Sequence, residues 1–526
     1  MTLSPLTPII IGVGETRQKN FTIETCKEPA ELILSAIRNA SQDSSLDVIV
    51  HVDSISVVPP WSWTYDDLPK LLAHRLGIQP THLELANHGG NTPALLCDNA
   101  AARVAAGQSK MAVVTGGEAL ASLFACQKAG QMPPPGWTKV DPNSKRYSPG
   151  DTSLKKGVGA THSIGNPIQV YPLYENAYRK QNRQSYIENH DESAALYAQF
   201  DTIACQHPNS WRAGEPPRGL DTIKTVNKHN RMICTPCESA VDKYLMPADL
   251  SDPLLMNAFN GVNLAAACII TSVEYATKLG VPREKWVYIT GGAGSNDSSD
   301  FWERSNYYSS PAIEYSIDNA LNAAGLTKNE IDCFDFYSCF PIVPKIACKH
   351  VGLDLLQPNK PITLLGGLTS FGGAGNNYSL HAIAEMVRVI RYGKHQNGLV
   401  LANGGVLSWQ HAICLSSKPR RNGASYQKQE VLDNGQTSQG PAFTSQARGE
   451  AVIETYTVDH DRSGPKLGHI VGRLVESGHR FIANHGDGIT LTALVSTTIE
   501  PIGMRGHVEV GPDGRNIFTI APSAKL

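Results

Sequence analysis

The stretch His88-Gly89-Gly90-Asn91-Thr92-Pro93-Ala94-Leu95 opens an Ala-rich segment that continues to Ala106. An apolar run of strand length, Met111 to Thr115, comes next and ends in Gly116-Gly117-Glu118. This pattern predicts a glycine-rich turn, a helix and a buried strand. A helix that begins at such a turn leaves unpaired backbone N–H groups and a positive dipole end, which suit a phosphate, a carboxylate or a developing oxyanion.

The second half of the chain repeats this order. Phe371-Gly372-Gly373-Ala374-Gly375-Asn376 opens a helical segment that runs through Arg391, and the apolar run Gly398 to Ala402 leads into Asn403-Gly404-Gly405. Because turn, helix, strand and paired glycines recur at similar spacing, the sequence predicts a duplicated α/β unit.

The rest of the chain fits an α/β fold with two additions. Between about 122 and 250 the alternation of strands and helices weakens, and the sequence is rich in Pro, Tyr, Asn and His. We expect a long excursion over the surface there, of the kind that usually has a function. After a polar stretch, the last part alternates like strands with Gly turns, which indicates a small all-β module of the OB type. The predicted boundaries are a first half at 1–275, a second half at 276–416, a linker at 417–445 and a β domain at 446–526.

Composition excludes several classes of protein. The chain has 526 residues, of which 41% are hydrophobic and 18% charged, as in a globular protein of several domains. The net charge is −2 and the longest basic run, Lys418-Pro419-Arg420-Arg421, is short, so nucleic acid is not an expected partner. The best uncharged apolar run, residues 262–273, is shorter than the roughly 18 residues of a membrane helix.

The cysteines and the two ends of the chain bear on location. The eleven cysteines are scattered along the chain, as expected for reduced thiols in an intracellular protein. Cys234-Thr235-Pro236-Cys237 is a CxxC motif without a second pair, so a structural role is favoured over a redox or zinc site. Met1-Thr2-Leu3-Ser4-Pro5 has no basic region, so we expect no secretory signal. Ala524-Lys525-Leu526 is a variant of the Ser-Lys-Leu peroxisomal address. We therefore expect the peroxisomal import receptor as a partner and a peroxisomal location, or otherwise a cytoplasmic one.

Four motifs in order, together with the duplication and the long insertion, resemble the thiolase superfamily over about residues 6–416. The stretch Asn87 to Leu95 stands where thiolases carry the nucleophilic Cys, and Asp335-Phe336-Tyr337-Ser338-Cys339-Phe340 where they carry an Asn-Glu-Ala-Phe or His-Asp-Cys-Phe motif. Gly366 to Gly375 resembles the loop of the Gly-His pair, and Asn403-Gly404-Gly405 the Cys-x-Gly motif. With its β domain, the chain resembles type 1 thiolase-like proteins, relatives of sterol-carrier-protein thiolases. The resemblance implies two βαβαβαββ halves in five αβαβα layers.

All four chemical positions depart from the thiolase pattern. The first Cys position is His88, the Gly-His position is Gly372-Gly373, the second Cys position is Asn403, and the remaining position is Tyr337. Ping-pong thiolysis needs a thiolate, and the fold would place none at these positions. Cys97 lies nine residues beyond His88 on the same predicted helix, about 13 Å away.

His88 and Tyr337 are the sharpest catalytic candidates. The positive end of a helix should leave His88 neutral, as a base or a hydrogen-bond donor, although a capping role is an equal alternative. The Tyr337 phenol can bind an oxyanion or, with a lowered pKa, deprotonate a hydroxyl, and the alternative is a buried aromatic residue. By analogy, the steroid-side-chain aldolases of this superfamily use a Tyr in retro-aldol cleavage, and their thiolase-like subunit pairs with an OB-type subunit.

The other candidates are weaker. His381 and Asn403 are catalytic candidates that could orient a carbonyl or a water, with core packing and a turn as the respective alternatives. Asn377, like the other asparagines of the two turns, could hold loop geometry alone, and Cys339 has packing as its main alternative. The residues expected to contact substrate or CoA are Gly89, Gly90, Asn91, Cys339, Gly372, Gly373, Asn376, Gly404 and Gly405. No GxGxxG, Walker or HExxH pattern is present, so we expect no metal and no tightly bound cofactor, with a CoA thioester as substrate or ligand.

We consider three functions for a chain with this resemblance. The first is an acyl-CoA-processing enzyme of the acyltransferase family that makes or cleaves a C–C bond at the α or β carbon without a Cys acyl-enzyme, by retro-aldol or Claisen chemistry. The second is an acyl-CoA or lipid-binding relative that has lost the chemistry, and a scaffold without CoA affinity is a third. We also expect a homodimer, and a β domain that covers the pocket mouth or binds an acyl chain. Its turns at 478–481 and 484–487 could touch CoA phosphates, with solvated turns as the alternative.

Overall fold

The computed structural model describes residues 3–140, 157–225, 227, 230, 256–421, 423–433, 440–461 and 464–521. Ala524-Lys525-Leu526 and the pair Cys234 and Cys237 lie outside these residues, so the peroxisomal address and the interpretation of the CxxC stay predictions.

The first half forms a five-stranded sheet in the order β3-β2-β4-β5-β1. Strands β2, β3 and β4 are parallel, whereas β5 is antiparallel to β4 and β1. All but β3 and the end of β1 are buried along their length, because helices cover both faces of the sheet. The strands are β1 (Pro8–Arg17), β2 (Ser54–Val58), β3 (His82–Leu85), β4 (Met111–Ala119) and β5 (Asn263–Ser272).

The second half repeats this sheet. Its order β6-β9-β8-β7 matches β1-β5-β4-β2, which confirms the duplicated α/β unit. A short antiparallel contact of Ile9 and Ile10 with Tyr288 and Val287 joins the two half-sheets at β1 and β6. Within the described residues, β3 has no counterpart in the second half. The strands are β6 (Val287–Asn296), β7 (Cys333–Phe336), β8 (Asn397–Gly404) and β9 (Trp409–Ser416).

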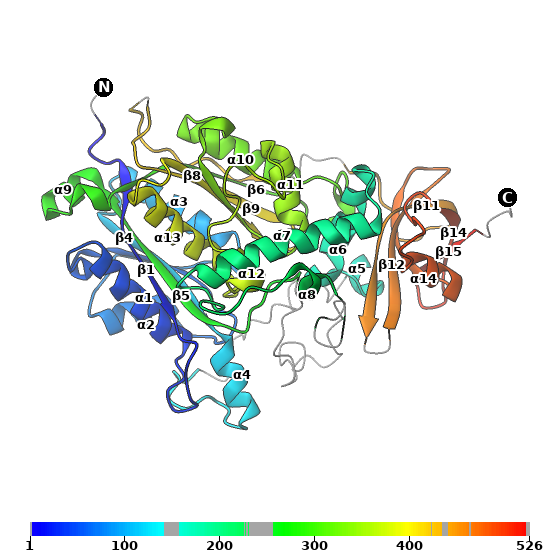
Figure 1. Ribbon diagram of the computed structural model, residues 1–526, viewed down its shortest axis with the longest axis horizontal. Coiled ribbons are helices and arrows are strands. Elements are labelled where there is room, and N and C mark those ends of the chain that lie inside the picture. The colour runs from blue at the N-terminus through cyan, green and yellow to red at the C-terminus, as the bar shows by residue number, and fades with distance from the viewer. Residues whose placement is uncertain are drawn as a thin grey trace.

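Helices α3 (Thr92–Ala105) and α13 (Tyr378–Arg391) lie between the two half-sheets, and each contacts strands of both (Figure 1). Helix α1 (Pro29–Asp43) covers the outer face of the first half-sheet, and α10 (Pro311–Ala324) covers that of the second. Successive residues of β1 point to opposite faces of the sheet. Ile9 packs in the hydrophobic cluster that contains α1, and Ile10 packs in the cluster that contains α3 and α13. The structure therefore has the five αβαβα layers of a thiolase-like fold.

Smaller helices complete the two halves. They are α2 (Leu68–Leu76), α9 (Val273–Leu279), α11 (Ile342–Val351) and α12 (Gly367–Ser370), with 3₁₀ helices at Ile49–His51, Arg283–Lys285, Phe301–Glu303 and Lys328–Glu330. In the described part of the chain, no helix is long and apolar enough to cross a membrane.

The expected surface excursion is mostly helical where the structure describes it. Helices α6 and α7 each begin with a capping box, formed by Asn166 with Gln169 and by Ser185 with Glu188. Tyrosines on α6 and α7 are buried in the main core, and Pro172 sits inside α6. These residue types are weak helix formers, which explains why the periodicity did not predict helices there. The helices are α4 (Leu120–Lys128), α5 (Val158–Thr161), α6 (Pro167–Gln181), α7 (Tyr186–Gln206) and α8 (Leu220–Lys224).

The C-terminal β domain is a closed five-stranded barrel in the order β11-β12-β13-β15-β14, with α14 between its third and fourth strands. This is the strand order of an OB-fold, as the sequence predicts. The segment predicted as a linker contributes β10 (Leu432–Asp433), which pairs with β6. The barrel elements are β11 (Gly449–Asp461), β12 (Gly464–Leu474), β13 (Arg480–His485), α14 (Gly488–Leu494), β14 (Arg505–Val510) and β15 (Asn516–Ile520).

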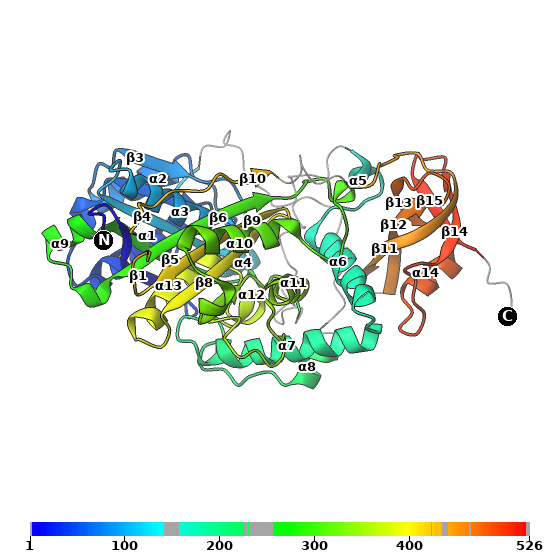
Figure 2. The same cartoon turned by 90° about the horizontal axis from the view of Figure 1, so that it is seen from above.

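The barrel packs on helix α6 at one end of the molecule (Figure 2). Arg179 of α6 forms an ion pair with Glu500 at 2.6 Å and donates to the Tyr456 hydroxyl at 2.9 Å. The Thr455 hydroxyl donates to the Leu173 carbonyl at 2.6 Å. The insertion in the first half therefore connects the thiolase-like core to the barrel.

Candidate active site

Two glycine-bearing turns meet between the half-sheets. We call residues 88–91, before α3, the first turn, and residues 371–377, before α13, the second turn. The side-chain amide of Asn376 donates to Nδ1 of His88 at 3.0 Å, across 288 positions of sequence. Asn377 beside it donates to the Gly116 carbonyl at 2.8 Å, so the second turn is also tied to strand β4.

His88 is half-buried in the first turn, and burial lowers its pKa to about 4. A neutral imidazole agrees with the sequence-based expectation, but burial and not the helix end is its cause, because α3 begins at Thr92 with Asn91 as its N-cap. His88 lies four residues before the helix rather than in its first turn. Since Asn376 donates to Nδ1, the proton of the neutral ring is on Nε2.

Gly90 holds the first turn against the second half of the chain. A Cβ at this position would lie 2.4 Å from the Asn403 carbonyl oxygen and 2.5 Å from the Tyr337 hydroxyl. A Cβ at Gly404 would lie 2.4 Å from Oδ1 of Asn91. Glycine at both positions allows this close approach. Three of the four thiolase-like motifs therefore meet at Gly90, and Asn376, directly after the fourth motif, contacts His88.

Tyr337 is buried at the end of β7, and its backbone N–H donates to the Leu401 carbonyl at 3.0 Å. Burial raises the pKa of its phenol well above the ordinary value, and the nearby Cys339 adds to the rise. The hypothesis of a phenol with a lowered pKa is therefore wrong. Tyr337 stays protonated at neutral pH, and it can donate a hydrogen bond to an oxyanion.

Asn403 is buried and its amide is committed to protein groups. Its Nδ2 donates to the Tyr171 hydroxyl at 2.8 Å and contacts Sγ of Cys339 at 3.7 Å, and its Oδ1 accepts from Gln410 at 2.6 Å. Burial raises the pKa of Cys339 to about 12, so this residue is a thiol at neutral pH. Its position fits the packing alternative better than that of a nucleophile.

Tyr171 is the site residue that the sequence did not reveal. It belongs to α6 in the insertion, stacks on Phe340 with ring centroids 4.4 Å apart, and lies 232 positions from Asn403. The Leu407 backbone N–H donates to its hydroxyl, which in turn faces the Gly405 carbonyl, each at 3.3 Å. The signal available was the run of tyrosines around Pro172, which carries no information about this long-range contact.

His381 belongs to a different cluster. It is fully buried on α13, and its Nδ1 lies 2.5 Å from Glu15 Oε1 on β1. Burial of Glu15 opposes its ionisation, but the hydrogen bond from His381 and the charges of His381 and Arg388 lower its pKa to about 2. These contacts favour the core-packing alternative for His381. A catalytic role for it stays a prediction.

The other predicted contact residues lie at varied places around the turns. The Gly373 N–H donates to the Phe259 carbonyl at 2.7 Å, and Gly372, with φ +115°, packs near Val262 and Leu264. These two glycines therefore face the segment that leads into β5. A Cβ at Gly89 would meet Oδ1 of Asn91 at 2.4 Å. A substrate role for each of these residues stays a prediction.

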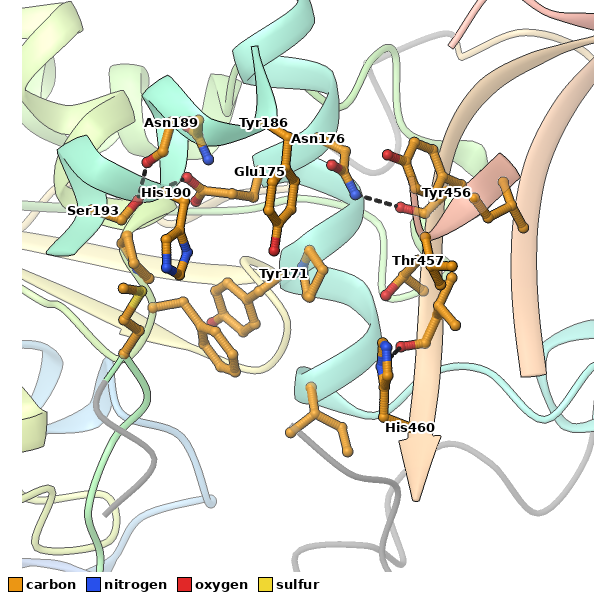
Figure 3. A pocket seen from close by; sticks show the side chains of 18 of the residues that line it. Tyr171, Glu175, Asn176, Tyr186, Asn189, His190, Ser193, Tyr456, Thr457 and His460 are labelled. Atoms are coloured by element: carbon orange, nitrogen blue, oxygen red, sulfur yellow. Dashed lines mark hydrogen bonds between the residues drawn. The ribbon is translucent and has the colours of Figure 1, made fainter. Parts of the chain in front are cut away.

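A cavity of about 270 Å³ lies between the insertion helices and the barrel (Figure 3). Tyr171 and Phe340 line it, and the Tyr171 hydroxyl also contacts Asn403, so the cavity and the meeting point of the turns share a wall. The barrel supplies Tyr456, Val458 and Leu494 to the opposite wall. The barrel therefore forms one side of this cavity.

The described cysteines offer no activated nucleophile. All nine are buried and free. Cys97 is buried on α3, and its pKa is raised by the neighbouring Cys268 thiol and by burial. Among the described residues, no group of three or more His, Cys, Asp or Glu side chains is arranged to hold a metal.

Comparison with known proteins agrees with this architecture. Residues 429–515 match the family model of the thiolase-like protein type 1 additional C-terminal domain. The structure of a monomeric SCP2-thiolase like protein type 1 from Mycobacterium smegmatis has 30% sequence identity and a TM-score of 0.80, covering 99% of this chain and 100% of that one. None of the curated proteins matches the chain in sequence.

Two more distant structures share the fold. The Ltp2-ChsH2(DUF35) aldolase has a TM-score of 0.56 at 16% identity, over 78% of this chain and 98% of that one. Human mitochondrial 3-ketoacyl-CoA thiolase has a TM-score of 0.51 at 16% identity, over 79% of this chain and 100% of that one. At full coverage and 30% identity to the mycobacterial protein, the chain belongs to the family of SCP2-thiolase-like proteins of type 1.

Proposed function

We propose that the protein acts on acyl-CoA thioesters and makes or cleaves a C–C bond at the α or β carbon without a Cys acyl-enzyme. The observation that carries this proposal is that the Tyr337 hydroxyl lies against Gly90, in the same turn that carries His88, where the thiolase pattern has its nucleophile. Both side chains are neutral hydrogen-bond donors. Cys339, the cysteine of these motifs, is a thiol with a pKa raised to about 12. The groups suit stabilisation of an enolate better than nucleophilic attack.

The chemistry needs donors aimed at a developing oxyanion. In a retro-aldol reaction of a β-hydroxyacyl-CoA, the Cα–Cβ bond breaks, the Cβ hydroxyl becomes the carbonyl of the released fragment, and the hydroxyl proton leaves to water. The electron pair of the bond becomes the enolate of the shortened thioester, which then takes a proton at Cα. The Tyr337 phenol and the Nε2–H of His88 would donate to the enolate oxygen, and such preorganised donors are often the largest catalytic contribution. With a pKa of about 4, His88 is a weak base at neutral pH, so we assign it the donor role.

The ligand assignment rests on relatives. One of the solved neighbours is human mitochondrial 3-ketoacyl-CoA thiolase in complex with CoA, and another is described as an aldolase. We extend CoA binding to this chain as part of the proposal, with the acyl chain in the cavity bounded by Tyr171 and Phe340. No tightly bound cofactor is needed for this chemistry.

Product analysis tests the proposal. The protein is incubated with a panel of 3-hydroxyacyl- and 3-oxoacyl-CoAs, and the products are followed by mass spectrometry. We expect turnover that falls about 100-fold or more in Tyr337→Phe and in His88→Ala with the fold intact, because each loses one donor to the oxyanion. Cys339→Ser is the matched control and should keep turnover, since no thioester forms on it. Unchanged turnover in both donor variants would refute the assignment.

The second candidate function is binding of acyl-CoA or lipid without catalysis. Both ends of the Asn403 amide are occupied by Tyr171 and Gln410, which favours a binding protein with an inert site. Saturable CoA binding without product from any thioester would support this function. Absence of any CoA affinity would support a scaffold instead.

The assembly state is a separate proposal. The thiolase resemblance favours a homodimer through β3, the edge strand of the first half-sheet, where Leu83 and Leu85 are exposed. The mycobacterial relative is described as monomeric, which favours a single chain. Light scattering on the purified protein distinguishes one chain from two.

A further inference from the structure

The turn between β8 and β9 comprises residues 405–408 and begins two residues after Asn403. The Asn403 carbonyl lies against the first turn, 2.4 Å from the place of the Cβ that Gly90 lacks. Leu407 in the β8–β9 turn is buried and has φ +62°, which residues other than glycine rarely adopt. A backbone of this kind persists only where its surroundings hold it, so the contacts of this turn bear on the candidate active site.

Arg304 holds the β8–β9 turn at two points. It is buried at 4% exposure, its Nη1 donates to the Val406 carbonyl at 2.7 Å, and its Nη2 donates to the Ser408 hydroxyl at 2.9 Å. Nη1 also donates to the Tyr174 hydroxyl at 2.9 Å, and Nε donates to the Ser298 carbonyl at 3.0 Å. Because the guanidinium is planar and rigid, these contacts fix its orientation and that of the turn together.

Arg480 of the barrel holds the backbone on either side of Arg304. It is a fully buried residue of β13, and its Nη atoms donate to the carbonyls of Trp302 at 2.9 Å, of Ser305 at 3.3 Å and of Arg304. Its Nε and Nη2 also donate to the Glu454 carboxylate on β11, at 2.9 and 2.6 Å. The five N–H groups of this guanidinium therefore have five acceptors, three of them backbone groups of the core.

The two arginines link the barrel to the meeting point of the glycine-bearing turns. Arg480 fixes the backbone of residues 302–305, and Arg304 within that segment fixes residues 405–408. Hydrogen bonds from a charged donor to buried acceptors are among the strong ones in proteins. Most of these acceptors are main-chain carbonyls, so the bonds position backbone rather than flexible side chains. A shift of Arg480 would therefore displace the turn that follows Asn403.

We propose that Arg304 is a positioning residue for the active site and that Arg480 extends this role to the barrel, so that the barrel completes the site. The inference rests on the proposed function, in which His88 and Tyr337 donate to one oxyanion. The β8–β9 turn keeps the Asn403 carbonyl against Gly90, and this close approach holds the first turn against Tyr337. Loss of either arginine contact would leave the two donors less well aligned.

A matched pair of barrel variants tests the contribution of Arg480. Arg473 and Arg480 are paired across β12 and β13, and both donate to Glu454. Arg473 is 38% exposed, and within the described residues its side-chain hydrogen bonds go to Glu454 alone. Arg473→Lys and Arg480→Lys thus both keep the charge and weaken the contact with Glu454, but only Arg480→Lys weakens the contacts with residues 302–305.

Hydrogen–deuterium exchange of the full-length protein reads out the position of the turn without requiring turnover. The amides of residues 405–408 are compared with those of β4, which serves as an internal reference. We expect Arg480→Lys to speed exchange in the turn about tenfold and to leave β4 unchanged, whereas Arg473→Lys changes neither. A general loss of stability would speed exchange in β4 as well, so the reference separates positioning from folding.

A second pair of variants tests Arg304 while both arginines stay in place. Ser408→Ala and Tyr174→Phe each remove one hydroxyl that accepts from Arg304, and only Ser408 belongs to the turn. We expect kcat for cleavage of a 3-hydroxyacyl-CoA to fall about tenfold in Ser408→Ala, with KM changed by less than about twofold, because the turn orients the donors and does not bind the acyl chain. Tyr174→Phe should keep the wild-type kcat.

The outcomes separate this inference from the proposed function. Exchange in the turn of Arg480→Lys at the wild-type rate, or faster exchange in β4 to the same degree, overturns the role of the barrel. An equal loss of kcat in Ser408→Ala and Tyr174→Phe, or unchanged kcat in Ser408→Ala, overturns the positioning role of Arg304. Absence of turnover of every thioester by the wild type overturns the proposed function, and the exchange rates still decide whether the barrel holds the turn.

Discussion

The two glycine-bearing turns occupy equivalent places in the two halves, yet they are held differently. In the first turn, the Cβ that Gly90 lacks would meet a backbone carbonyl and the Tyr337 hydroxyl. In the second turn, the Cβ that Gly373 lacks would first meet the side-chain amide of Asn260. Backbone cannot yield without moving a strand, whereas a side chain can rotate. The first turn is therefore the rigid partner, and the second turn positions groups against it.

This difference assigns separate roles to the turns. The first turn carries His88 and touches Tyr337, the two donors of the proposed chemistry. The second turn contributes Asn376, which fixes the tautomer of His88. Substitutions in the first turn should thus break the fold and the site together, and substitutions in the second turn should misdirect one donor.

The largest effect is expected for Gly90→Ala. The added methyl group overlaps the Asn403 carbonyl at 2.4 Å, so we expect the free energy of unfolding to fall by about 3 kcal/mol and turnover to be lost. Gly488→Ala is the control, because no atom lies within 4 Å of its added Cβ. Denaturant unfolding of both variants measures the effect. Equal stability of the two variants would contradict the close approach at Gly90.

A smaller effect is expected for Asn376→Ala. Without its amide, Nδ1 of His88 loses its donor, so both neutral tautomers become populated and turnover falls about tenfold. Asn377→Ala is the neighbouring control, since that amide donates to Gly116 instead. Nitrogen-15 shifts of the His88 ring provide a readout that loss of stability alone would not move. If the His88 ring has the same tautomer in Asn376→Ala as in the wild type, Asn376 does not position His88.

Gly373→Ala should cost less than Gly90→Ala. The nearest atom is Oδ1 of Asn260 at 2.3 Å, the end of a side chain that can turn away, so we expect a loss of about 1 kcal/mol. The same unfolding measurement checks this value. A loss as large as that of Gly90→Ala would show that the two turns are equally rigid.

The last prediction concerns the pH dependence of His88. The pKa of His88 is lowered by burial to about 4, below the ordinary value of 6.5, so the unfolded chain binds more protons between these pH values. The contribution of His88 to stability is present above pH 6.5 and is lost as the pH falls toward 4. Proton NMR of the ring should show no titration from pH 5 to 8. A midpoint near 6.5 would mean that His88 is solvated and the first turn open.

The sequence predicts local features well. The run Met111 to Thr115 is part of β4, because burial patterns act over a few residues. The strand continues through the paired glycines to Ala119. The duplication brought His88 and Asn376 to one place, since equivalent turns of the two halves lie at the ends of adjacent central helices. The strands of the barrel also follow from short-range strand and turn signals.

Long-range contacts and burial are what the sequence cannot supply. Tyr171 reaches the site from a helix that contains Pro172, and no local pattern connects it to Asn403. The direction of the Tyr337 pKa depends on burial by distant segments, so a phenol with a lowered pKa was an open option. The hydrogen-bond contact of His381 with Glu15 likewise crosses 366 positions.

The central claim is that the two turns form one site that cleaves a C–C bond without an acyl-enzyme. A single-turnover reaction analysed by mass spectrometry tests it most directly. Protein in excess is mixed with a 3-hydroxyacyl-CoA and quenched at intervals, and the small molecules and the intact protein are weighed in the same samples. We predict a carbonyl fragment and a shortened acyl-CoA that appear together while the mass of the protein stays unchanged, with both products lost in Tyr337→Phe. An acyl adduct on any cysteine that forms and decays with the products would contradict the account.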